Sequence, residues 1–112
     1  MWLEYIKERM PNKSVLEIGE GAGFTIYYPF EAENSMYIED VYIDKKFRRS
    51  NLATTMMLEI EEKAKEAGFK YILGSCDPTT VGATMSAQGM LNRGFKLYSV
   101  KDGVIFFRRE IE

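Results

Sequence analysis

The sequence predicts an α+β fold in which a central mixed sheet starts with antiparallel strands and carries helices on both faces. Apolar residues recur at helical spacing in some segments and form short β-branched and aromatic runs in others. A strand, a loop, a helix and a strand follow one another between residues 36 and 74, and this order favours a parallel pair with a right-handed crossover. With 112 residues, 46% of them hydrophobic, the chain has the length and composition of one globular domain, residues 1–112.

The first half of the chain predicts one helix and three strands. A short amphipathic helix precedes Pro11, because apolar residues recur there at helical spacing, at Trp2, Leu3, Ile6 and Met10. Glycine-rich turn chemistry follows the strand 14–18 and leads into an aromatic and β-branched strand, 24–30. After a second turn comes a third strand, 36–43.

The second half predicts two helices and three more strands. A helix covers 52–67 and is closed by Gly68, and a short apolar strand covers 69–74. Asp77-Pro78 is expected to open a second helix capped by Thr79 and Thr80 and ended by Gly94. Lys101-Asp102-Gly103 is a hairpin signal between the last two strands, 95–100 and 104–109.

Composition excludes several classes of function. A net charge of -2, with 15 basic and 17 acidic side chains, argues against nucleic acid as the main partner. No apolar run reaches the roughly 20 residues of a membrane span, and the start of the chain does not read as a signal peptide, so we expect a cytoplasmic protein. Cys76 is the only cysteine and histidine is absent, which excludes a disulfide framework, disfavours a zinc site and removes a Ser-His or Cys-His nucleophile pair. The chemistry must therefore use carboxylates, hydroxyls, Arg, Lys and backbone amides.

The basic loop at 44–49 leads from the strand 36–43 directly into a helix N-terminus. The first backbone N–H groups of a helix have no intrahelical partner, and the helix dipole adds about half a positive charge there. Such a turn suits an anion such as a pyrophosphate. The alternative is a solvated loop whose Arg and Lys side chains face water.

The segment from Arg48 to Ala53 resembles the central motif of the GNAT superfamily of N-acetyltransferases, in which Arg or Gln is followed by x-x-Gly-x-Gly/Ala. The following helix, short strand and second helix, which ends in Arg93-Gly94-Phe95, are similar to the same family in order and spacing. The resemblance runs from about Met36 to Tyr98. It implies a GNAT-like acyl-CoA N-acyltransferase fold. It also implies an enzyme that transfers an acetyl group from acetyl-CoA to a primary amine of a small molecule or protein, by direct attack in a ternary complex.

In that family the loop amides hold the pyrophosphate of acetyl-CoA, and the splayed end of the preceding strand bonds the pantetheine arm. Asn51 stands where the first Gly of the motif is usual, and Asn is the next most tolerant residue of left-handed backbone. The implied cofactor-binding residues are Val41, Ile43, Arg48, Arg49, Ser50, Asn51, Leu52, Ala53 and Thr54.

Glu39 is the candidate base, since it shares strand parity with Val41 and Ile43 and is expected to point to one face with them. Its alternative role is that of a strand-edge carboxylate. The Tyr that serves as the family's usual acid falls on Met90, which is expected to pack in the core or against the cofactor. The candidate acids are instead Tyr98, which we assign, Tyr42 and Ser86.

Two departures from the family leave a second interpretation open. Met90 replaces the Tyr, and Ala83 replaces the Asn that often opens the second helix. These changes would fit a catalytically degenerate acyl-CoA-binding regulatory or interaction protein. A third interpretation is a nucleobase-modifying member acting on DNA. The family's first strand and helix have no counterpart before the strand 36–43, so the acceptor side is expected to be open, and a homodimer would complete it.

Overall fold

A computed structural model describes residues 2–19, 21–48, 51–80 and 82–111. Two one-turn 3₁₀ segments, Glu31–Glu33 and Lys45–Phe47, flank the third strand. The helices and strands are α1 Trp2–Arg9, β1 Ser14–Ile18, β2 Gly23–Phe30, β3 Ser35–Ile43, α2 Leu52–Glu66, β4 Tyr71–Cys76, α3 Ala83–Asn92, β5 Lys96–Lys101 and β6 Val104–Glu110. Their order confirms the predicted one.

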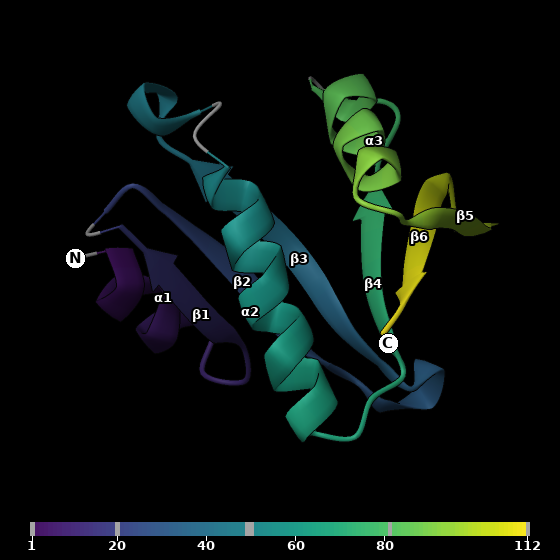
Figure 1. The fold of residues 1–112 in the computed structure, drawn as a ribbon, viewed down its shortest axis with the longest axis horizontal. Helices are drawn as coiled ribbons and strands as arrows, with labels where there is room; N and C mark the ends of the chain where they lie inside the picture. The colour runs from purple at the N-terminus through teal and green to yellow at the C-terminus, as the bar shows by residue number, and fades with distance from the viewer. Residues whose placement is uncertain (1, 20, 49–50, 81, 112) are drawn as a thin grey trace.

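The strands form one six-stranded sheet in the order β1-β2-β3-β4-β6-β5 (Figure 1). Every neighbouring pair is antiparallel except β3 and β4, which run parallel and are connected through α2. This arrangement confirms both the mixed sheet with an antiparallel start and the crossover predicted for 36–74.

Helices α2 and α3 cover the same face of the sheet. Ile60 and Ala64 of α2 are fully buried in a core cluster that also receives Met90 of α3. The sheet contributes alternate residues to this cluster, among them Met36 and Ile72. Figure 1 shows α2 lying along β2 and β3, while α3 lies over the upper part of β4.

Strands β3 and β4 separate part of the way along their length. Their ladder pairs Ser35 with Tyr71 and ends with Tyr37 opposite Leu73. β3 continues to Ile43 and β4 to Cys76 without further pairing between them. The ends that follow Tyr37 and Leu73 therefore leave backbone groups free to bond something other than a neighbouring strand.

The start of α3 differs from the sequence prediction. The carboxylate of Asp77 accepts hydrogen bonds from the Thr79 N–H at 2.9 Å and from the Thr79 hydroxyl at 2.7 Å, and the Thr80 hydroxyl donates to the Asp77 carbonyl at 2.8 Å. This local turn competes with helix formation, so the helix begins at Ala83 after Gly82, whose φ is 84°. Thr79 and Thr80 thus close a turn and do not cap the helix.

Strand β4 begins two residues later than predicted, at Tyr71–Cys76. The Phe69 N–H donates a hydrogen bond to the Ala64 carbonyl, and this bond holds Phe69 at the end of α2.

No helix in the described ranges is long and apolar enough to cross a membrane.

Candidate functional site

A pocket of about 360 Å³ lies where β3 and β4 separate. A volume of this size is within the range of small-molecule sites. Both strands contribute to its wall, as do the first half of α2 and the second half of α3. The lining residues are Ile38, Glu39, Asp40, Val41, Ala53, Met57, Gly74, Ser75, Gly89, Met90, Arg93 and Phe95.

The N-terminus of α2 is presented to this pocket by an unusual backbone conformation. Asn51, the N-cap residue, has φ 65° and ψ 12°, in the left-handed region that the sequence analysis anticipated for this position. Its side chain makes no capping hydrogen bond with any residue that the structure describes. Within the described part of the chain, nothing caps the first-turn amides of Leu52, Ala53 and Thr54, which can therefore bind an anion. Arg49 and Ser50 lie outside the described residues.

The free edge of β3 presents the backbone of Val41 and Ile43. In an antiparallel ladder, alternate residues direct their N–H and C=O groups toward the same neighbour. The Asp44 N–H donates to the Ala22 carbonyl of the β2 side at 2.7 Å, so Tyr42 also faces β2 while Val41 and Ile43 face the opening. A hydrogen bond supports this orientation: the Arg48 Nε–H donates to the Ile43 carbonyl at 3.0 Å.

A β-bulge at Glu39 changes the face that this residue occupies. β2 pairs Ile26 with Asp40 but pairs Tyr27 with Ile38, so Glu39 is the extra residue of β3. The parity expectation that grouped Glu39 with Val41 and Ile43 was therefore wrong. Val41 pairs with Thr25 toward the α2 face, whereas Glu39 points to the opposite face.

The bulge is held by a side chain from β2. Thr25 is 1% exposed, and its hydroxyl donates to the Asp40 carbonyl at 2.9 Å. This bond adds a side-chain link between β2 and the residue of β3 that follows the bulge. The pairing of β2 with β3 and the Thr25 bond therefore fix the position of Glu39.

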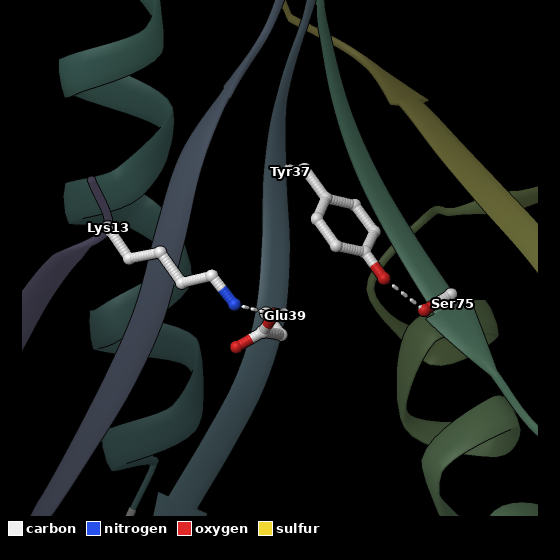
Figure 2. Close-up of polar contacts among 4 residues, drawn as sticks. All are labelled: Lys13, Tyr37, Glu39 and Ser75. Carbon is white, nitrogen blue, oxygen red and sulfur yellow. Dashed lines mark hydrogen bonds and ion pairs between the residues drawn. The ribbon is translucent and has the colours of Figure 1, made fainter. Parts of the chain in front are cut away.

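Glu39 forms an ion pair with Lys13, the residue just before β1 (Figure 2). The two side chains are 32% and 29% exposed, respectively. The hydrogen bond from Lys13 to the Glu39 carboxylate is the main cause that raises the pKa of Lys13. Since Glu39 also lines the pocket, it connects the pocket with the face of the sheet that α2 and α3 do not cover.

Tyr37 and Ser75 bridge the separating strands. The Tyr37 hydroxyl and Ser75 Oγ lie 2.5 Å apart (Figure 2); Tyr37 is the last paired residue of β3, and Ser75 lies two residues beyond its partner Leu73. Ser75 also lines the pocket. Sequence reasoning missed both hydroxyls. The sequence shows on which face of its strand each hydroxyl lies, but it does not show where the two strands separate.

Tyr98 does not lie at this pocket. Its hydroxyl donates to Glu33 Oε2 at 2.8 Å, a bond that is the main cause raising the pKa of Tyr98. Glu33 precedes β3, and Glu39 lies four residues beyond Ser35, about 13 Å along the strand. This location corrects the assignment of Tyr98 as the acid, since the structure does not bring it together with Glu39. Tyr42, the second candidate, contacts the ring of Phe24 and is not a lining residue.

Met90 and Arg93 complete the wall from α3. Met90 packs against the core cluster and lines the pocket, so it contacts both, and its sulfur lies over Gly74, where an added Cβ would be 2.7 Å away. Arg93 donates from Nη1 to the Gly89 carbonyl at 3.0 Å, while its buried Nε has no partner among the described residues. An unpaired buried N–H is rare in proteins. Sequence reasoning had used Arg93 only as part of the closing motif.

Comparison with known proteins agrees with this geometry. A GNAT-family acetyltransferase of Elizabethkingia anophelis with acetyl-CoA bound has a TM-score of 0.72 at 16% identity, over 96% of this chain and 82% of that chain. The PaiA N-acetyltransferase of Thermoplasma acidophilum in complex with coenzyme A has a TM-score of 0.75 at 13% identity, over 96% of this chain and 67% of that one. A Listeria monocytogenes acetyltransferase of the GNAT family has a TM-score of 0.70 at 19% identity, over 94% of this chain and 69% of that chain.

At these identities the structures establish a shared fold. No protein of curated function matches the chain in sequence. The sequence model of the acetyltransferase (GNAT) family, by contrast, matches residues 3–95, which is most of the chain. The chain therefore belongs to the GNAT family of acetyltransferases.

Proposed function

We propose that residues 1–112 act as one acetyl-CoA-dependent N-acetyltransferase domain, which transfers the acetyl group to a primary amine by direct attack in a ternary complex. The observation that carries this proposal is the pocket where β3 and β4 separate, which joins the first turn of α2 to the carboxylate of Glu39. An anion-binding helix terminus and a carboxylate residue that line one pocket suit a phosphate-bearing acyl donor and an amine acceptor.

The residues around the pocket fit acetyl-CoA. The first-turn amides of α2, which follow the left-handed Asn51, suit the pyrophosphate, and Arg48 adds positive charge beside them. The open backbone of Val41 and the Ile43 N–H suit the amide groups of the pantetheine arm. Arg93 lines the same pocket and adds a positive charge to its wall.

Glu39 is the proposed base. The acceptor arrives as an ammonium and becomes nucleophilic only when a proton is removed. Glu39 lines the pocket and also bonds Lys13 on the face of the sheet that α2 and α3 do not cover. Bound acetyl-CoA supplies the activated acyl group. The ammonium first passes one proton to Glu39, and the neutral amine nitrogen then attacks the acyl carbon. The C–N bond forms, the C–S bond breaks, and the nitrogen releases its second proton to solvent while the departing thiolate takes up one proton.

Tyr37 and Ser75 are the proposed proton donors to the departing thiolate. Their hydroxyls are hydrogen-bonded to each other at the pocket, whereas the family's usual tyrosine position holds Met90. A hydroxyl pair can pass one proton outward while the second hydroxyl remains hydrogen-bonded to the first.

The test is thiol release from acetyl-CoA against a panel of polyamines, amino acids and peptides. Glu39→Gln keeps the side-chain shape but cannot accept a proton at neutral pH, so kcat/KM for the amine should fall by about 10² to 10⁴. The affinity for acetyl-CoA should stay unchanged. The deficit should shrink as the pH approaches the pKa of the amine, because solvent then supplies the neutral nucleophile.

Glu17→Gln is the matched control, because Glu17 is an exposed carboxylate on β1 outside the pocket lining. It should leave kcat/KM within about twofold of the wild type. Full activity of Glu39→Gln at neutral pH would remove Glu39 as the base. Acetyl-CoA binding without turnover of any amine would instead support the regulatory acyl-CoA-binding interpretation.

A further inference from the structure

Four side chains gather where Glu39 emerges on the face opposite α2 and α3. The ammonium of Lys13 forms an ion pair with Glu39, 26 residues away in sequence, and lies 5.3 Å from the ring centroid of Tyr28. Tyr28 in turn meets Tyr37 edge-on, with ring centroids 5.2 Å apart. The ammonium is thus held by one carboxylate and one aromatic ring. Figure 2 shows the Lys13–Glu39 pair on one side of β3 and the Tyr37 hydroxyl pointing away from it toward Ser75.

This combination has the chemistry of a cation-binding site. A carboxylate gives an alkylammonium a charge-assisted hydrogen bond, and an aromatic face adds a cation–π attraction. A tyrosine ring is a neutral phenol at physiological pH, and partial burial raises the pKa of Tyr28 further. The occupant in this structure is the chain's own ammonium at the end of an unbranched aliphatic stem.

We propose that the cluster of Glu39, Tyr28 and Tyr37 is the acceptor subsite, that it takes a primary alkylammonium on an unbranched chain, and that Lys13 occupies it in place of the substrate. This proposal rests on the proposed function, because Glu39 is shared between the cluster and the pocket. Lysine side chains of a protein and small aliphatic diamines share the required chemistry.

An external ammonium can displace the Lys13 side chain from this site. Both members of the ion pair are about one-third exposed, and exposed ion pairs are weak because water competes for each charge. An external ammonium can therefore exchange with Lys13 by moving one flexible side chain. The internal ion pair keeps Glu39 from carrying an unpaired charge when no acceptor is bound.

The test measures the binding of cadaverine to the full chain without acetyl-CoA. Calorimetry gives the affinity, and the NMR signals of the Tyr28 and Tyr37 rings report where the ligand binds. Lys13→Met keeps the unbranched apolar stem and removes the competing charge. It should bind cadaverine about threefold to tenfold more tightly than the wild type, with shifts at both rings. The matched control is Lys101→Met, an exposed lysine of β5, which should bind as the wild type does.

Adding Glu39→Gln to Lys13→Met should abolish the gain, and 1,5-pentanediol, which carries no charge, should not bind. Equal cadaverine affinity in wild type and Lys13→Met, or ring signals that do not move, would overturn the proposal. A peptide with one internal lysine forms the second arm. Whichever of the two probes gains more from Lys13→Met identifies the source of the alkylammonium.

Turnover separates this proposal from the proposed function. If the subsite is the acceptor site, Lys13→Met should lower KM for the alkylamine by a similar factor and leave KM for acetyl-CoA unchanged. Cadaverine binding with no turnover in any variant would leave the cation site standing and refute the acetyltransferase activity. Turnover of alkylamines with KM insensitive to Lys13→Met would refute the subsite alone.

Discussion

Asn51 offers a test of how the backbone builds the phosphate-binding turn. Its φ of 65° lies in a region where an L-residue is strained by roughly 1–2 kcal/mol, less for Asn than for residues with a larger or branched Cβ. Asn51→Ala should therefore destabilise the fold by about 1 kcal/mol. For 112 residues this corresponds to a fall in Tm of about 4 °C. Asn51→Gly should keep Tm within about 2 °C of the wild type, because glycine adopts this conformation without strain.

The assay is thermal unfolding with and without desulfo-CoA. Asn51→Gly should retain the rise in Tm that the ligand causes, while Asn51→Val, which combines a branched side chain with positive φ, should lose most of it. Asn92, the last residue of α3, provides the matched control, since Asn92→Ala is expected to be neutral or slightly stabilising. If Asn51→Val unfolds at the wild-type temperature and responds fully to the ligand, the left-handed residue does not shape the turn.

Three further substitutions test single contacts. Thr25→Val leaves the Asp40 carbonyl of the bulge without its donor and should destabilise the fold by about 1–3 kcal/mol, read from chemical denaturation; unchanged stability would contradict the role of this bond. Tyr98→Phe removes only the bond to Glu33 and should leave kcat within about twofold, whereas a hundredfold loss would restore Tyr98 as the acid. Arg93→Leu removes a pocket-lining guanidinium and its hydrogen bond to the Gly89 carbonyl, so it should weaken acetyl-CoA binding about tenfold and destabilise the fold by about 1 kcal/mol; equal affinity by calorimetry would exclude Arg93 from acetyl-CoA binding.

The sequence by itself determined the order of the elements, because local signals carry it. Helical spacing, short β-branched runs and glycine turns placed eight of the nine helices and strands within two residues of their observed starts. The turn at Asn51 was also readable, since only a few residue types tolerate a left-handed backbone. The start of α3 was missed because the Asp77 turn competes with a helix signal of similar composition.

Tertiary structure alone decided which chemical groups meet. The bulge that turns Glu39 to the opposite face depends on the register between β2 and β3, and strand parity in the sequence cannot show an extra residue.

The ion pair of Glu39 with Lys13 and the contact of Tyr37 with Ser75 span 26 and 38 residues. Tyr98 was assigned from its residue type, yet its strand carries it to Glu33, before the start of β3. Local propensities place a residue on an element, but the side chains it meets are set by how the strands pair, shift and separate, and those depend on contacts distant in sequence.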